Sequence, residues 1–76
     1  METAYILFSC EIGKENELAS VLHDLKEIKE VMITYGDYDI VVKAQTSNSS
    51  QMDTLITSKI RKIEKIRSTI TLRVTN

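Results

Sequence analysis

The residues best suited to chemistry lie in one short stretch of the sequence, YGDYDIVVKA, in which Gly36 is followed by Asp37 and Asp39. A glycine–aspartate turn can leave backbone N–H groups pointing outward, which suits a carboxylate, and neighbouring aspartates suit an ammonium. These groups predict a site for the zwitterionic end of a free amino acid, with Tyr35 and Tyr38 shaping the pocket. The alternative is an ordinary hairpin turn, because glycine and aspartate are common turn residues.

The sequence has few residues suited to metal binding, phosphate binding or catalysis. His23 is the only histidine and Cys10 the only cysteine. A metal site needs several converging ligands, and the spacing nominates no third ligand beside Asp37 and Asp39. The sequence also has no phosphate-cradling glycine loop and no nucleophile with an evident base. We therefore expect no catalytic residue, no metal and no cofactor.

The stretch YGDYDIVVKA must be positioned by the rest of the fold, which is predicted to begin with a strand and a helix. The residues from Ala4 to Ile12 alternate between apolar and mostly polar, which predicts a strand with one buried face and places Cys10 in the core. Gly13 ends this run. Apolar residues then recur at three- and four-residue steps within KENELASVLHDLKE, which predicts a helix. They are Leu18, Val21, Leu22 and Leu25.

The second half predicts a hairpin, a helix and a last strand. The runs IKEVMITY and DIVVKAQ, joined by the glycine–aspartate turn, are typical of a β-hairpin. The polar cluster TSNSSQ supplies a helix N-cap, either Asn48 ahead of Gln51 or Ser50 ahead of Asp53. The closing segment RSTITLRVTN alternates as a fourth strand. The apolar stripe of the second helix consists of Met52, Leu55, Ile56, Ile60 and Ile63.

This order of elements predicts an α+β, ferredoxin-like βαββαβ domain spanning residues 1–76, with a four-stranded antiparallel sheet and both helices on one face. A chain this short has a small core, for which oligomerisation is a usual remedy. The other face is half apolar and suits a partner sheet, so we expect dimerisation through it; a solvated face is the alternative. Its expected residues are Tyr5, Leu7, Met32, Thr34, Val41, Thr69 and Thr71, among Ser9, Lys43 and Arg73.

Composition restricts the partners and the location. The formal net charge of -1 gives no electrostatic footprint for a phosphate backbone, so no direct binding of nucleic acid is expected. The third strand, DIVVKAQ, also lacks the aromatic residues with which sheets of this order stack RNA bases. The start, METAYILFSCEIG, has no basic leader, and its apolar run is too short to span a membrane. We expect a cytoplasmic protein without a membrane partner.

The motifs also resemble a known family. YGDYDIVVKA followed by ITSKIRKIEKIRSTITLRV resembles the effector domain of the Lrp/AsnC family, the regulation-of-amino-acid-metabolism (RAM) domain, over Ala4 to Val74. In that family the hairpin reads like TGxYDxxxxV and the tail like I…I…GVxxTxTxxVL. The resemblance implies a βαββαβ fold whose sheets pair face to face into dimers, which assemble into rings, commonly octamers. It also implies that an amino acid binds between neighbouring dimers, near the hairpin turn.

Carried over by position, the resemblance implies a ligand site on two elements. Gly36, Asp37, Tyr38 and Asp39 would form the turn that handles the ammonium and carboxylate of the ligand. The fourth strand would add Ser68, Thr69 and Thr71.

The sequence departs from the family pattern in two ways. Most members carry an N-terminal helix-turn-helix that binds DNA, whereas this sequence begins at the first strand and so resembles the stand-alone form. Tyr35 stands where the family usually has threonine, and Lys65 where it often has glycine. Because Tyr35 is beside the implied pocket, the identity of the amino acid stays open.

The sequence as a whole predicts a non-enzymatic, homo-oligomeric amino-acid sensor. Binding between subunits would favour one assembly over another, because a ligand shifts an equilibrium through its differential affinity for the two states. Full-length Lrp/AsnC relatives are possible partners through which transcription would be regulated. One alternative is a small dimeric enzyme of the αβ-barrel type, for which His23 is the only neutral-pH acid or base. The other is a scaffold that oligomerises without a ligand.

Overall fold

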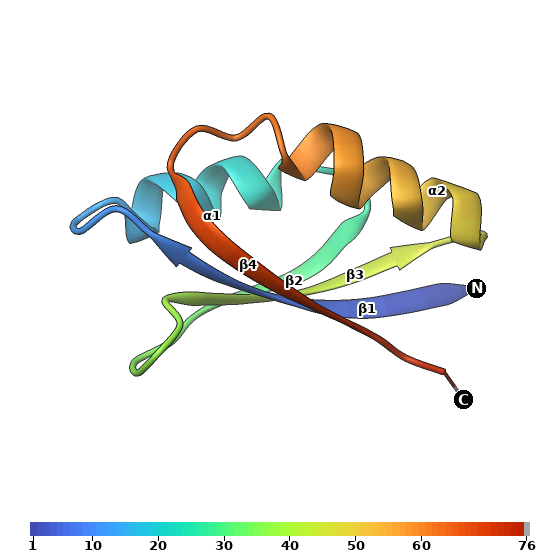
Figure 1. The fold of residues 1–76 in the computed structure, drawn as a ribbon, viewed down its shortest axis with the longest axis horizontal. Coiled ribbons are helices and arrows are strands. Elements are labelled where there is room, and N and C mark those ends of the chain that lie inside the picture. Colours follow the sequence, from blue (N-terminus) through green and yellow to red (C-terminus); the bar gives the residue numbers. More distant parts are fainter. Residues whose placement is uncertain (76) are drawn as a thin grey trace.

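A four-stranded antiparallel sheet carries the helices on one face in the computed structural model, which describes residues 1–75 (Figure 1). The strand order across the sheet is β2-β3-β1-β4, and every neighbouring pair is antiparallel. This arrangement confirms the predicted ferredoxin-like βαββαβ fold. The elements are β1 (Glu2–Cys10), α1 (Glu15–His23), β2 (Ile28–Ile33), β3 (Ile40–Thr46), α2 (Ser49–Thr54), the π-helical segment η1 (Leu55–Ile60) and β4 (Ile66–Arg73).

The strand β1 ends earlier than its alternating pattern indicates. Cys10 is its last residue and is buried, as predicted, whereas Ile12 is 93% exposed and was wrongly included. The reason is a tight turn, in which Lys14 N donates to Glu11 O at 3.0 Å and Gly13 adopts a positive φ of 82°. The turn removes Ile12 from the sheet, although its side chain continues the apolar alternation.

The second helix begins at a side-chain cap and changes its winding halfway. Gln51 N donates to Asn48 Oδ1 at 2.9 Å, and Ser47 N donates to Gln51 Oε1 at 2.9 Å, so Asn48 is the N-cap. The α-helix then passes into η1, whose π-type winding brings residues five apart toward one side. Leu55 and Ile60 are both buried there for that reason.

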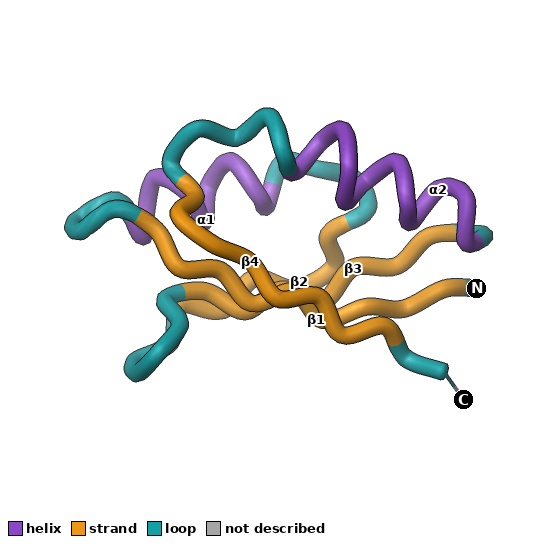
Figure 2. The backbone as a smooth tube through the Cα atoms, in the orientation of Figure 1, coloured by secondary structure: helices purple, strands orange, loops and turns teal. Residues whose placement is uncertain are grey.

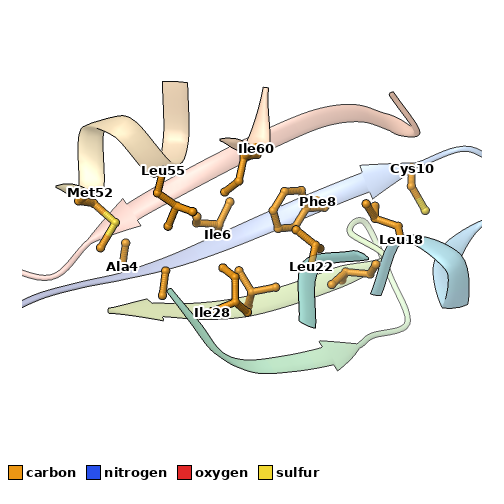
Figure 3. Packing of buried hydrophobic residues seen from close by; sticks show 13 residues of the cluster. Ala4, Ile6, Phe8, Cys10, Leu18, Leu22, Ile28, Met52, Leu55 and Ile60 are labelled. Atoms are coloured by element: carbon orange, nitrogen blue, oxygen red, sulfur yellow. The ribbon is translucent and has the colours of Figure 1, made fainter. Parts of the chain in front are cut away.

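The core lies between the helices and the face of the sheet on which Ala4, Ile6 and Phe8 lie (Figure 3). Each of these three side chains is at most 1% exposed, and the buried leucines of α1 contact the same layer. Alternation along β1 and β3 therefore predicted the core correctly. Its other members are Cys10, Leu18, Leu22, Ile28, Ile40, Val42, Ala44, Met52, Leu55 and Ile60.

The predicted facing of the last strand was wrong. In the register of β1 and β4, Thr71 lies opposite the buried Ile6, so Thr69, Thr71 and Arg73 are on the helix side of the sheet. A period of two does not by itself say which set of residues faces the core. Because β4 is an edge strand whose helix-side residues are not buried, these positions tolerate polar side chains.

The face away from the helices, hereafter the open face, is consequently more apolar than the sequence indicated. Ile70 pairs with Leu7 and Leu72 pairs with Tyr5 across β1 and β4. On the same face, Met32 of the other edge strand, β2, pairs with Val41 of β3. The open face thus has an apolar surface that crosses all four strands. Its residues are Tyr5, Leu7, Met32, Val41, Ile70 and Leu72.

Candidate functional site: the hairpin groove

Hydrogen bonds connect the two ends of the β2–β3 turn, whereas the backbone N–H groups at its tip are unpaired. Thr34 N donates to Asp39 O at 2.8 Å, and Thr34 Oγ1 donates to Tyr38 O at 2.7 Å. Gly36 has a φ of 139°, which other residues rarely adopt. Within residues 1–75, the backbone N–H groups of residues 35–38 donate to no backbone or side-chain acceptor. The turn therefore leaves these four N–H groups without an acceptor among the described residues.

Asp39 has a structural partner in the neighbouring strand. Its backbone N–H donates to Phe8 O at 2.8 Å, and its Oδ2 accepts from Cys10 N at 2.9 Å. The carboxylate thereby satisfies the last amide of β1 and joins it to the turn. Burial raises the pKa of the Cys10 thiol, and the nearby charge of Asp39 raises it further, so Cys10 stays a neutral core thiol.

Asp37 differs from Asp39 in that no protein group within residues 1–75 bonds to its carboxylate. It is exposed and lines a groove of about 520 Å³ beside the turn. We call this the hairpin groove. The β2–β3 turn and the β1–α1 loop project from the same end of the sheet (Figure 2), and both contribute residues to the lining. Its lining residues include Ser9, Ile12, Ile33, Tyr35, Asp37 and Arg67.

Apolar residues at the rim of the groove were not predicted to belong to it. Ile12 and Tyr35 are almost fully exposed, and Ile33 is 51% exposed. Exposed apolar side chains gathered around a groove are typical of a binding surface. Ile12 was assigned to the core from its alternation, so no sequence signal separated it from Ile6 or Phe8.

Arg67 is the second residue that the sequence did not nominate. The β1–β4 pairing shifts between Ser9 and Cys10, which pair with Ser68 and Ile66, so Arg67 is the extra residue of a β-bulge. Bulges re-aim side chains and are frequent beside functional sites. Arg67 forms no salt bridge within the described residues, and it supplies a positive charge to a groove that also holds Asp37.

The three fourth-strand candidates lie outside the hairpin groove. Ser68, Thr69 and Thr71 line a separate depression of about 270 Å³ beneath η1. Ser68 Oγ also donates to Ser9 Oγ at 3.2 Å. Among the described residues, Arg67 is the one that lines both depressions. The structure thus brings Tyr35, Asp37 and Asp39 together but keeps the fourth-strand residues apart from them.

Residues suited to catalysis or metal binding do not gather in the described part of the chain. His23 is exposed at the last turn of α1 and lines neither the hairpin groove nor the depression beneath η1. Among residues 1–75, no group of three or more histidine, cysteine, aspartate or glutamate side chains is placed to hold a metal ion.

The fold and the sequence together assign the chain to a known class of domain. The profile of the Lrp/AsnC ligand binding domain matches residues 3–76, so the chain belongs to this family. The chain is 41% identical over 71 residues to the HTH-type transcriptional regulator FL11 of Pyrococcus furiosus, covering 93% of this chain and 46% of the regulator. It spans about half the length of the curated relatives of this kind.

Solved structures give the same assignment. The hypothetical protein PHS023 from Pyrococcus horikoshii matches with a TM-score of 0.95 and 39% identity, over 100% of this chain and 92% of that chain. E. coli AsnC matches with a TM-score of 0.90 and 25% identity, over 99% of this chain and 51% of that chain.

A different kind of relative covers less of the sequence. A homocitrate synthase of Saccharolobus islandicus is 42% identical over 52 residues, which is 68% of this chain but only 10% of the enzyme. The match therefore concerns a small part of that enzyme. None of the described helices is both long and apolar enough to cross a membrane.

Proposed function

We propose that the chain is a non-enzymatic regulatory domain that binds a free amino acid in the hairpin groove, at a contact between subunits. The observation that carries the proposal is the combination of unpaired N–H groups in residues 35–38 with the unpaired carboxylate of Asp37. Amide N–H groups suit the ligand carboxylate, and Asp37 suits its ammonium. Because Asp39 Oδ2 already accepts from Cys10 N, we propose that Asp39 supports the groove and that Asp37 is the ammonium ligand.

The exposed apolar rim supports the subunit contact. The groove is open to solvent on a single chain, and Ile12, Ile33 and Tyr35 would be covered by a neighbouring subunit. A ligand held between two subunits has a higher affinity for the assembled state, so its binding shifts the assembly equilibrium. Regulation of transcription through longer relatives of the family, in the cytoplasm, is part of the same proposal.

The open face supports the second contact, between two copies of the sheet. It holds six apolar residues of which Tyr5, Met32, Ile70 and Leu72 are each 38–54% exposed. Burial of such a surface contributes about 25 cal/mol per Å² of apolar area. We propose a face-to-face dimer through this surface, with the hairpin groove available for assembly of dimers into a larger ring.

The fold of a distant relative is consistent with this ligand class. The structure of a Neisseria meningitidis transcriptional regulator is described as a complex with L-Met, and it matches with a TM-score of 0.85 at 13% identity. At this identity the match concerns the fold alone. The match therefore does not identify the amino acid that we propose for this chain, and a titration panel is needed to find it.

Calorimetric titration with a panel of free amino acids tests the proposal. We expect at least one to bind and Asp37→Ala to weaken it at least tenfold, because the ammonium loses its charged partner. Asp24→Ala is the matched control, since Asp24 is an exposed aspartate outside the groove. If none binds, the proposed function is wrong, and if Asp37→Ala binds as tightly as Asp24→Ala, the assignment of the site is wrong.

A further inference from the structure

A depression of about 540 Å³ lies at the end of the sheet remote from the hairpin turn. It is bounded by the α1–β2 loop, the last residues of β3 and the helical segment α2–η1, which Figure 1 shows together at the far end of β3. Because β3 has seven residues, it separates this depression from the hairpin groove by about 20 Å. We call it the lysine pocket; its defining residues are Lys26, Glu27, Lys29, Thr46, Gln51 and Lys59.

The charges that line the lysine pocket are predominantly positive. Lys59 is neutralised by Glu27, with 2.5 Å between Nζ and Oε2. Lys29 Nζ donates only to the backbone oxygen of Lys26, at 3.0 Å. Within residues 1–75, no carboxylate forms a salt bridge with Lys26 or Lys29. Two ammonium groups without a salt bridge therefore line one pocket of a chain whose formal net charge is -1.

Neutral donors lie in the same pocket. The cap of α2 orients Gln51, since its Oε1 accepts from Ser47 N at 2.9 Å. The amide NH₂ of Gln51 is thereby left with its hydrogens unused among the described residues. Hydroxyl groups of Ser50 and Thr54 add further polar atoms to the lining. Lysine ammonium groups together with amide and hydroxyl donors are suited to the oxygens of a phosphate group.

Glu27 fixes the orientation of Lys59, the third lysine of the pocket, through one carboxylate oxygen, and its other oxygen has no partner among the described residues. Lys59 belongs to the π-helical segment η1, and its contact with Glu27 holds that segment against the α1–β2 loop. The other oxygen, Glu27 Oε1, is buried and has no hydrogen-bond partner within residues 1–75. A buried acceptor without a partner is unfavourable. A ligand that carries a hydroxyl group beside its phosphate would supply the missing donor.

We propose that the lysine pocket binds a small phosphate-bearing anion, with Lys26 and Lys29 as the charged contacts and the Gln51 amide as a neutral donor. A pocket lined by charge of one sign concentrates the opposite ion. This site is separate from the hairpin groove and does not depend on amino-acid binding there. The chain would then respond to two kinds of ligand, one at each end of the sheet.

Calorimetric titration with inorganic phosphate, glycerol phosphate and citrate, at constant ionic strength set by chloride, tests the proposal. The double variant Lys26→Gln/Lys29→Gln removes the two charges. The matched control, Lys14→Gln/Lys62→Gln, removes two lysines outside the pocket. We expect the phosphate compounds to bind the wild type, with at least a tenfold loss of affinity in the pocket variant and less than a twofold change in the control.

Amide chemical shifts then locate the binding. On addition of glycerol phosphate, we expect the largest changes at residues 26–29 and 45–51, with little change at residues 34–39. Undetectable binding of both phosphate compounds at millimolar concentration would overturn the proposal. Binding of citrate in preference to phosphate would overturn the assignment of the ligand class. An equal loss of affinity in both double variants would show a general charge effect and would reject the pocket.

Discussion

The carboxylate of Asp39 accepts a hydrogen bond from the backbone N–H of Cys10, with 2.9 Å between Oδ2 and N. This bond joins the β2–β3 turn to the end of the central strand, from which the β1–α1 loop continues. The two walls of the hairpin groove are therefore fixed relative to each other by Asp39, while Asp37 beside it has an unpaired carboxylate. The two aspartates of the motif thus differ in their hydrogen bonding.

Replacement of Asp39 is expected to reduce stability. Asp39→Ala leaves the Cys10 N–H without its acceptor, so the free energy of unfolding should fall by about 1–3 kcal/mol. Asp39→Asn keeps an acceptor oxygen and should recover most of the loss. Urea denaturation measures both. Asp37→Ala is the control and should stay within about 0.5 kcal/mol of the wild type; equal losses for Asp37→Ala and Asp39→Ala would contradict the distinction.

Gly36 is expected to resist substitution for conformational reasons. Its φ of 139° is unfavourable for any side chain, although a Cβ there would meet nothing within 4 Å. Gly36→Ala and Gly36→Asn should each cost about 1–3 kcal/mol. Gly13, at a φ of 82°, lies closer to the left-handed region that asparagine tolerates, so Gly13→Asn should cost less. Thermal unfolding of the three variants compares them, and equal losses at both positions would oppose this explanation.

Local signals in the sequence predicted much of the fold. The alternation along β1 identified Ala4, Ile6 and Phe8 as core residues, because successive side chains of a strand point to opposite faces of the sheet and the helices cover only one of them. Asn48 was one of two caps that the polar cluster offered, and its spacing to Gln51 is the one realised. Such features depend on neighbours within a few residues, which a sequence pattern can reveal.

The unpredicted features depend on contacts between distant segments. Arg67 enters the hairpin groove because β4 shifts its register against β1, and alternation does not reveal a bulge. The facing of Thr69 and Thr71 is set by the same pairing. The hydrogen bond between Asp39 and Cys10, twenty-nine residues earlier, likewise leaves no local signal in the sequence. The positions of the strands were therefore predictable, whereas their registers were not.

The corrected facing of β4 predicts how assembly responds to mutation. Ile70 is on the open face, so Ile70→Glu should place a charge in the proposed dimer interface and dissociate it. Thr69→Glu introduces the same charge one residue earlier, on the helix side, and should leave the assembly intact. Sedimentation velocity of both variants measures the change. Dissociation by Thr69→Glu alone would mean that the open face is not the interface.

The ion pair of Glu27 and Lys59 predicts a pH dependence of stability. Burial is the largest single influence on the pKa of Glu27 and raises it, but the hydrogen bond from Lys59, a backbone hydrogen bond and the charges of Lys59 and Lys26 together outweigh burial and lower the net pKa below its ordinary value of 4.5. A carboxyl group with a lowered pKa stabilises the folded state above pH 4.5, and this contribution disappears as the pH falls through the folded pKa. The free energy of unfolding should therefore decline on acidification below pH 4.5.

Removal of Lys59 should reverse the sign of this dependence. In Lys59→Met the Glu27 carboxylate loses its side-chain partner, so burial, the largest single influence, should prevail over the backbone hydrogen bond and the charge of Lys26 and raise the pKa above 4.5. The variant should lose about 1–3 kcal/mol at pH 7, because Lys59 is partly exposed and the pair is screened. It should recover part of this loss as the pH falls toward 4.5. Parallel pH profiles for the variant and wild type would exclude the pair as the cause.

A crystal structure of the assembled protein, grown with the amino acid that binds most tightly in the calorimetric panel, tests the central claim most directly. We predict that the ligand carboxylate lies against the N–H groups of residues 35–38, that its ammonium contacts Asp37, and that a neighbouring subunit covers Ile12 and Tyr35. A structure in which the β2–β3 turn projects into solvent, with the amino acid bound elsewhere, would contradict the proposed function.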